Sequence, residues 1–229
     1  MTILCIETST TCCSAAITID GRAVASQENL SGANHASELP VFIEQLLLTA
    51  RKKEWKLDAV ALSQGPGSYT GLRIGASIAK GLCYGLNIPL IPVDTLQILC
   101  AAAKDLQSNI DGVLCPMLDA RRMEVYTAKY QPTDLKALSE VEAKIIDEKS
   151  FADELEKKVM YFFGNGAEKC KAVIQAEHAQ FIDGIVPNAK HMGALAEKTP
   201  QLYIKQMAYY EPFYLKEFVP AASHVKGLN

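Results

Sequence analysis

A glycine-rich stretch that follows a short apolar run constrains the fold of this chain more than any other feature. The run Ala59–Leu62 is typical of a buried strand, and glycines at 65 and 67 flank a proline directly after it. Apolar residues then recur at steps of three and four, which predicts a helix over 70–85 capped by Ser68 or Thr70. A strand, a tight turn and a helix amino terminus can form an anion site, because backbone N–H groups converge there.

Two interpretations of this stretch stay open on the residues alone. No lysine follows Gly71, so the stretch is not a Walker A loop, and Thr70 stands where a dinucleotide fingerprint needs its third glycine. Gly71, Gly75 and Ala79 lie four apart on one helix face, which predicts a shallow groove for a neighbouring element. The stretch is therefore a phosphate loop, a packing surface, or both.

The composition is that of an ordinary globular protein. The chain has 229 residues, of which 49% are hydrophobic and 21% are charged, and its net charge is -3. The chain lacks the excess of positive charge that non-specific nucleic-acid binding needs. We therefore expect that, if this protein acts on RNA, another chain holds the RNA. Seven cysteines cannot all pair, which favours buried free thiols in a reducing compartment. Neither a leader-like amino terminus nor a long apolar run is present, and we expect a cytoplasmic location.

The order of predicted elements defines the fold class. Strands over 3–6, 13–19 and 23–28 form an antiparallel meander, with Asp20-Gly21 as a two-residue turn. A helix over 36–51 follows, capped by Asn34 or Ser37, with Pro40 tolerable in its first turn. After the strand and helix around the glycine stretch come a strand over 90–93 and a helix to 106, which a capping box at 94–97 begins. This βββαβαβα order is the ribonuclease H-like plan.

The second part of the chain repeats the first in outline. The predicted strands are 113–118, 124–130, 143–146 and 159–163, and the predicted helices are 150–158 and 188–198. Residues 132–140 are a loop, 164–166 are a sharp turn that leads into 167–175, and 209–229 are a tail. Glu7 and Asp119 end equivalent strands. We therefore expect an α/β protein with two ribonuclease H-like halves, residues 1–108 and 109–229. Two such halves meeting at a cleft is the plan of the actin, sugar-kinase and Hsp70 ATPase (ASKHA) group.

Several residues are candidates for a nucleotide or phosphate site in that cleft. The hydroxyl-rich segment after the first strand either faces an anion or forms an ordinary strand-end turn. Asp119 is either a catalytic acid with Arg121 as its partner or half of a solvated ion pair. The candidate site comprises Glu7, Thr8, Ser9, Gly65, Gly67, Ser68, Thr70 and Asp119.

Histidine and serine chemistry is not indicated. The four histidines are too scattered for a local metal site, and His35 is interpreted as a helix cap or a surface contact. Ser68 lacks the second glycine of a nucleophile elbow and has no recognisable base, which argues against a hydrolase.

Four blocks in the same order resemble one family over essentially the whole chain. They are Met1-Thr-Ile-Leu-Cys-Ile-Glu-Thr-Ser9, Gly65-Pro-Gly-Ser-Tyr-Thr-Gly-Leu-Arg-Ile-Gly75, Asp119-Ala-Arg121 with Glu124-Val-Tyr126, and Glu211-Pro212 with Tyr214-Leu-Lys216. The chain resembles the TsaB (YeaZ) family, paralogues of the transferase TsaD. The resemblance implies a non-catalytic partner of TsaD in threonylcarbamoyl transfer to adenosine 37 of ANN-decoding tRNAs (t6A37). TsaD carries a His-x-Glu-Gly-His metal motif, but this chain reads His35-Ala-Ser-Glu-Leu39, so no metal centre is expected.

The resemblance also implies partners and an interface. A TsaE-like ATPase joins the complex, tRNA is reached only through the complex, and the chain alone forms a homodimer through the surface that binds TsaD. The implied interface comprises His35, Leu39, Phe42, Leu46, Gly71, Arg73, Gly75, Ser77, Ala79 and Leu82. Glu7 stands where the family often has aspartate, and Lys216 where it often has arginine. Weak ATP or ADP binding in the cleft is compatible with such a partner. The alternatives are an autonomous ATP-binding enzyme and, more distantly, a glycoprotease-like peptidase.

Overall fold

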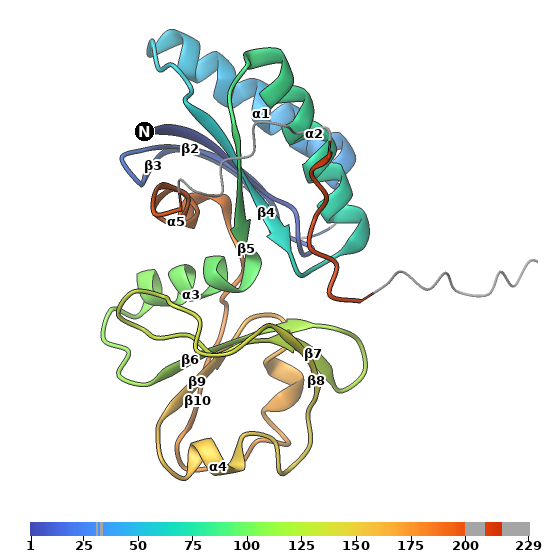
Figure 1. Ribbon diagram of the computed structural model, residues 1–229, viewed down its shortest axis with the longest axis vertical. Coiled ribbons are helices and arrows are strands. Elements are labelled where there is room, and N and C mark those ends of the chain that lie inside the picture. Colours follow the sequence, from blue (N-terminus) through green and yellow to red (C-terminus); the bar gives the residue numbers. More distant parts are fainter. Residues whose placement is uncertain (31, 33, 200–208, 217–229) are drawn as a thin grey trace, which may run out of the picture.

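The computed structural model describes residues 1–30, 32, 34–199 and 209–216, and these form two five-stranded sheets with helices around them (Figure 1). The first sheet has the order β3-β2-β1-β4-β5. Its strands are β1 (Thr2–Glu7), β2 (Cys13–Ile19), β3 (Arg22–Asn29), β4 (Ala59–Gly65) and β5 (Leu90–Asp94). β1, β2 and β3 are antiparallel, whereas β4 and β5 continue the sheet parallel to β1. The predicted half-meander, half-parallel plan is confirmed.

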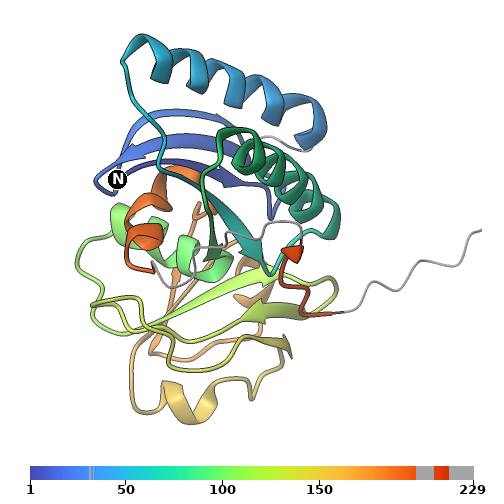
Figure 2. The same cartoon turned by 45° about the horizontal axis from the view of Figure 1, so that its top comes forward.

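Helices cover both faces of this sheet. α1 (His35–Lys52) and α2 (Tyr69–Leu86) lie on one face, and α3 (Thr95–Leu106) lies on the other, as Figures 1 and 2 show. Successive residues of a strand point to opposite faces. Leu4 and Ile6 of β1 therefore pack under α1 and α2, whereas Ile3 and Cys5 pack in the core that contains α3.

Local signals fix the turns and helix starts. Asp20 and Gly21 both have positive φ, 49° and 75°, as a two-residue hairpin turn of this type needs. Ser68 caps α2, because its Oγ accepts the Gly71 N–H at 3.3 Å. Asp94 caps α3 by accepting the Gln97 N–H at 3.0 Å.

The second sheet repeats the first in strand order. It reads β8-β7-β6-β9-β10, with an antiparallel meander β6-β7-β8 and parallel strands β9 and β10. Its strands are β6 (Val113–Asp119), β7 (Glu124–Thr127), β8 (Glu142–Ile145), β9 (Met160–Phe163) and β10 (Ala179–Ile182). β6 thus corresponds to β1, so Glu7 and Asp119 end equivalent strands, as expected.

The chain returns to the first sheet near its carboxyl end. A 3-10 turn η2 (Ala189–His191) and helix α5 (Gly193–Glu197) pack on the face that α3 covers, and the Ala189 N–H donates to Ser14 Oγ at 3.0 Å. Residues 209–216, which we name the C-terminal strap, also lie against the first half, where Tyr210 enters the core under α1 and α2. A boundary after residue 108 therefore does not enclose everything that packs on the first sheet.

Several predicted details of the second half are wrong. The predicted helix over 150–158 shortens to α4 (Ala152–Leu155), and residues 167–175 form a succession of turns around η1 (Glu168–Cys170). The predicted helix over 188–198 is broken into η2 and α5, and β10 was not predicted. These segments contain only one or two turns each, so tertiary packing rather than helical periodicity decides their backbone.

Pro40 is a further correction, because it lies in the second turn of α1 and not in the first. Proline lacks the N–H that would bond to the carbonyl of residue 36. Both Pro40 and Ala36 are exposed, so water can reach that carbonyl. All seven cysteines are free and buried, as predicted. Among the helices of the described residues, none has the length and apolar character to cross a membrane.

Candidate functional site

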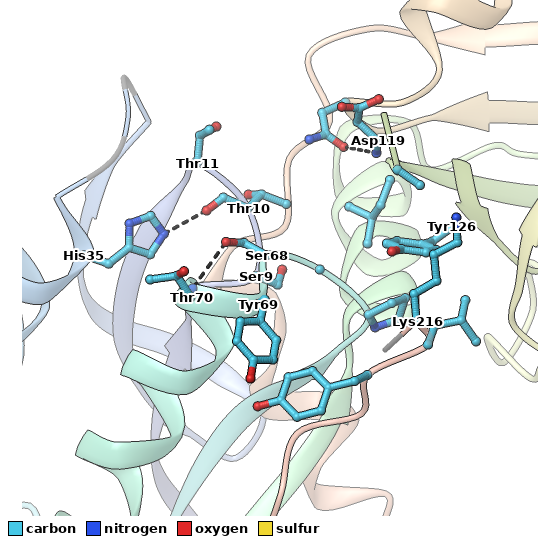
Figure 3. Close-up of a pocket in the computed structure, with 18 of the residues that line it drawn as sticks. Ser9, Thr10, Thr11, His35, Ser68, Tyr69, Thr70, Asp119, Tyr126 and Lys216 are labelled. Carbon is cyan, nitrogen blue, oxygen red and sulfur yellow. Dashed lines mark hydrogen bonds between the residues drawn. The ribbon is translucent and has the colours of Figure 1, made fainter. Parts of the chain in front are cut away.

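A cleft of about 770 Å³ lies between the two halves and brings together most of the predicted phosphate-site residues (Figure 3). Loops after β1 and β4 form one wall, and the ends of β6, β7 and β9 form the other. In Figure 3, Ser9, Thr10, Ser68 and Thr70 lie on the first side, and Asp119, Tyr126 and Lys216 lie on the second. The expected meeting of two halves at a cleft is therefore present.

Hydrogen bonds to the backbone carbonyls of the loop after β1 hold this loop in place. The Ser68 N–H donates to the Ser9 carbonyl at 2.6 Å, and His35 Nε2 bonds the Thr10 carbonyl at 2.8 Å. A Cβ on Gly67 would come closer than 3.0 Å to the Ser9 carbonyl, so only glycine lets the two loops approach this closely. The loop is thus preorganised.

Two hydroxyls of this loop are buried and have no hydrogen-bond partner. They are Thr8 Oγ1 and Ser9 Oγ. Both residues are almost completely buried, but Ser9 also lines the cleft, whereas Thr8 lies behind the lining. An unpaired buried hydroxyl costs stability. Because both oxygens are inaccessible to solvent, neither is exposed to the cleft.

Glu7 lies behind the cleft and not in it. Its side chain is fully buried, its Oε1 accepts the Ser9 N–H at 2.5 Å, and its Oε2 has no partner. Burial raises the pKa of Glu7 from 4.5 to about 7, although the bonds from Ser9 act in the opposite direction. The predicted role of Glu7 as a group facing a ligand is not supported by its position.

Asp119 lies on the opposite wall and is paired with a lysine. Its backbone N–H donates to Asn165 Oδ1 at 3.0 Å, and its carboxylate forms an ion pair with Lys169. Lys169 Nζ also donates to the Glu124 carbonyl at 2.7 Å, which fixes the ammonium beside the acid. Arg121 lines the cleft but is not the partner of Asp119, so that predicted pair is wrong.

The C-terminal strap forms the edge of the cleft. The Phe213 N–H donates to the Gln64 carbonyl at 2.7 Å, and the Tyr214 ring lies 5.0 Å from the Tyr69 ring. Gly65 has a φ of 113°, and a Cβ there would collide with the Phe213 carbonyl. Lys216 then forms an ion pair with Glu124 of the second half. The strap thus contacts both halves at the mouth of the cleft.

The predicted residues fall into two groups in the structure. Ser9, Gly67, Ser68, Thr70 and Asp119 line the cleft, whereas Glu7, Thr8 and Gly65 support its lining from behind. Sequence reasoning did not assign Asn165, Lys169, Tyr126 or the strap to the site. The turn Gly164-Asn165-Gly166 was the available signal for Asn165, because it follows β9 as the loop at Gly65–Gly67 follows β4.

The predicted docking groove along Gly71, Gly75 and Ala79 is wrong. A Cβ on Gly71 or Gly75 would come closer than 3.0 Å to atoms of Thr8, so this stripe is filled by the chain's own β1 loop. Ala79 is itself a core residue, and three more residues expected at the interface are also interior: Leu39 and Leu46 belong to the core, and His35 is buried against Thr10 beside the cleft.

The outer face of α1 and α2 carries a different groove. It has a volume of about 450 Å³ and is lined by Pro40, Ile43, Glu44, Leu47, Leu48, Arg51, Ile78 and Leu82. Phe42, Arg73, Ser77 and Leu82 of the predicted interface are exposed or half-buried, so their side chains are accessible. The Arg73 guanidinium lies 4.5 Å from the Tyr69 ring centre. Across the part of the chain that the structure describes, no three His, Cys, Asp or Glu side chains are grouped so as to hold a metal ion.

The repeated sheets and the cleft between them define a two-lobed α/β protein of the ASKHA class. Known proteins with similar sequences and structures agree with this class. The sequence model of tRNA N6-adenosine threonylcarbamoyltransferase (TsaD) matches residues 23–219. YeaZ from Pseudomonas aeruginosa superposes with a TM-score of 0.79 at 25% identity, over 93% of this chain and 99% of that one. The chain belongs to the TsaB (YeaZ) family, within the wider group that the TsaD model describes.

Individual relatives carry the same description, "tRNA threonylcarbamoyladenosine biosynthesis protein TsaB". The Bacillus subtilis protein is 35% identical over 131 residues, 57% of this chain and 56% of that one. The Escherichia coli protein is 37% identical over 131 residues, 57% and 55% respectively. The chain thus spans little more than half of these two relatives. The protein from Buchnera aphidicola subsp. Schizaphis graminum is 30% identical over 172 residues, which cover 74% of this chain and 80% of that relative.

Proposed function

We propose that this protein is a non-catalytic partner of a TsaD-like transferase in the synthesis of threonylcarbamoyladenosine at position 37 of ANN-decoding tRNAs. Membership of the TsaB family supports the pathway, because curated relatives are described as biosynthesis proteins for this modification. The apolar groove between α1 and α2 supports the role of a partner. It is the observation that carries the proposal.

The groove has the chemistry of a docking site for a helix. Its floor is aliphatic, and its charged members, Glu44 and Arg51, are exposed and available as a polar rim. Leu48 is 52% exposed and Val41 is 47% exposed, on a helix whose opposite face is core. Burying such side chains contributes about 25 cal/mol for each Å² of apolar surface. An amphipathic helix of the transferase would fill the groove.

The proposal extends to the other members of the assembly. In the absence of the transferase, a second copy of this chain would cover the groove and form a homodimer. A TsaE-like ATPase would join the complex with the transferase. The net charge of -3 gives this chain no general attraction for RNA, so we infer that tRNA is held by its partners.

Two other functions are less well supported. An autonomous ATP-dependent enzyme is favoured only by the cleft, but Glu7 is buried behind the lining and Asp119 is paired with Lys169, so neither acid is available to a metal–nucleotide complex. A peptidase would need a base beside Ser68, but Ser68 Oγ accepts the Gly71 N–H and His35 Nε2 is engaged with Thr10. Alanine at Ser68 would test residual peptidase activity directly.

The proposal is tested with a charge placed in the groove. Leu48→Asp should lower the affinity for the transferase at least tenfold and so reduce co-elution with it. The estimate is a cost of about 1.4 kcal/mol or more for an unpaired carboxylate in an apolar interface. Leu106→Asp is the matched control, because Leu106 is a leucine on α3 that is also exposed, at 67%. Threonylcarbamoyladenosine formation should fall in parallel in the reconstituted system.

Three results would contradict the proposal. The wild-type chain could fail to co-elute with its own transferase, deletion of its gene could leave the modification intact, or the two leucine variants could behave alike. Calorimetric dilution of the isolated chain would separately show whether it self-associates. If the groove forms that contact, the wild type should dissociate on dilution and Leu48→Asp should already be a monomer.

A further inference from the structure

Residues 51–56, which we name the basic end of α1, concentrate positive charge on the surface. Four exposed cations stand in this segment, and Glu54 is its only acid: the cations are Arg51, Lys52, Lys53 and Lys56. None of the four forms an ion pair with any residue that the structure describes. Four positive charges and one negative charge leave the segment with a net charge of +3, in a chain whose net charge is -3.

The helix dipole accounts for only part of this charge. Cations stabilise the carboxyl end of a helix, but the effect falls off beyond the last turn. Arg51 and Lys52 are in the last turn of α1, whereas Lys53 is the cap residue and Lys56 lies beyond the helix. Helix α2 has the same length of 18 residues and has no basic residue in its last turn. The basic end of α1 therefore carries more positive charge than the helix itself requires.

The backbone of the segment is fixed by the core. The Lys53 N–H donates to the Thr49 carbonyl at 3.0 Å, and the Trp55 N–H donates to the Ala50 carbonyl at 2.9 Å. The Trp55 side chain is half-buried and packs on the core under α1 and α2. The cations thus project from an ordered support, which lowers the entropy that is lost when a partner binds them.

The basic end of α1 lies beside the groove and far from the cleft. His35, at the start of α1, lines the cleft, and a helix of 18 residues is about 27 Å long. Figures 1 and 2 show the carboxyl end of α1 at the outer edge of the first half. Arg51 lines the groove, but the three lysines are not among its lining residues. A helix docked in the groove would therefore meet Arg51 and leave the lysines free for another partner.

We propose that the basic end of α1 binds the phosphate backbone of the tRNA that the transferase holds. The inference rests on the proposed function, because the transferase brings the tRNA to this chain. Lysine recognises phosphate as a point charge and does not read the bases, so the contact adds affinity without sequence specificity. The negative net charge of the whole chain opposes binding of free RNA, and the contact forms only when the complex raises the local concentration of RNA. RNA is favoured over an acidic segment of the transferase because the lysines lie outside the docking groove.

The experiment measures tRNA binding by the complex of the full chain with its transferase. Fluorescence anisotropy gives the affinity for labelled tRNA at several salt concentrations between about 50 and 200 mM. The variant Lys52→Gln/Lys53→Gln is compared with Lys157→Gln/Lys158→Gln, a pair of exposed lysines that follow α4 in the second half. Glutamine removes the charge and has a similar helix propensity.

We expect the Lys52→Gln/Lys53→Gln complex to bind tRNA about fivefold more weakly at the lowest salt concentration. The slope of log affinity against log salt should fall by about two, one for each lost phosphate contact. An unrelated RNA of the same length should lose affinity by the same factor, since no base is read. The control pair should change neither quantity, and both variants should co-elute with the transferase as the wild type does.

The outcomes separate this inference from the proposed function. A wild-type chain that does not co-elute with its transferase would overturn the proposed function and this inference with it. Normal co-elution together with equal tRNA affinity and salt slope in the two variants would overturn this inference alone. Loss of co-elution in Lys52→Gln/Lys53→Gln but not in the control would show that the basic end of α1 binds an acidic surface of the transferase, which would also overturn it.

Discussion

Glu7 gives the most quantitative prediction of this structure, because a fully buried carboxyl makes stability depend on pH. Burial raises its pKa from 4.5 to about 7. The folded protein therefore holds a proton on Glu7 over a pH range in which the unfolded chain has released it. This group favours the folded state fully below pH 4.5, and its contribution is lost as pH rises through 7. At about 1.36 kcal/mol for each pH unit across this interval, the loss is on the order of 3 kcal/mol.

Glu7→Gln removes the titration and keeps the shape. Gln Oε1 can still accept the Ser9 N–H, so we expect similar stability of wild type and variant near pH 5. At pH 8 the variant should be more stable, by up to about 3 kcal/mol, because the wild type then holds a buried carboxylate. Urea unfolding at pH 5, 6, 7 and 8 gives the free energy of unfolding of both proteins.

The difference between the two proteins is the informative quantity. Other groups that titrate in this range, such as His191, whose pKa is lowered by burial, act equally in both proteins and cancel. A difference in the free energy of unfolding that is flat from pH 5 to 8 would refute the reasoning. So would a variant that is less stable than the wild type at pH 8.

Two further predictions concern packing and are measured by urea or thermal unfolding. Gly71→Ala should lower the free energy of unfolding by about several kcal/mol, because its Cβ would collide with the Thr8 carbonyl. Gly81→Ala, on the open side of the same helix, should be neutral or stabilise the protein by about 1 kcal/mol. Equal effects of the two substitutions would contradict the assigned orientation of α2. Tyr210→Ala should destabilise the protein by about 3 kcal/mol, whereas Tyr209→Ala, at a tyrosine that is 85% exposed, should stay within about 0.5 kcal/mol. A small effect at Tyr210 would mean that the strap does not contribute to the core.

The first half could be predicted from the sequence because its signals are local and agree with one another. The hairpin turn at Asp20, the caps at Ser68 and Asp94, and the long helical periods of α1 and α2 each specify a boundary without reference to distant residues. The second half has shorter elements, and its helices of one or two turns are decided by packing, which a period of three to four residues cannot reveal.

The sequence predicted those residues of the site that lie at or just after the ends of strands. Ser9, Ser68 and Asp119 follow directly from the carboxyl ends of strands in a repeated topology. The pairing of Asp119 with Lys169 joins residues 50 positions apart, and Arg121, two residues away, was the nearer but wrong candidate. The burial of Gly71 and Gly75 against Thr8 could not be read from a stripe of small residues, because the same stripe suits an internal and an external neighbour.

The late return of the chain to the first sheet has a consequence for its biosynthesis. Ala189, Met192 and Ala196 complete the core on the α3 side, and Tyr210 completes the other core. At a synthesis rate of about 5–20 residues per second, the ribosome needs roughly 4 to 17 seconds to proceed from the end of α3 to η2. During that interval α3 covers this face of the first sheet, but the part that η2 and α5 cover in the finished protein is still exposed. The two cores of the first half are therefore completed only after the second half has been synthesised.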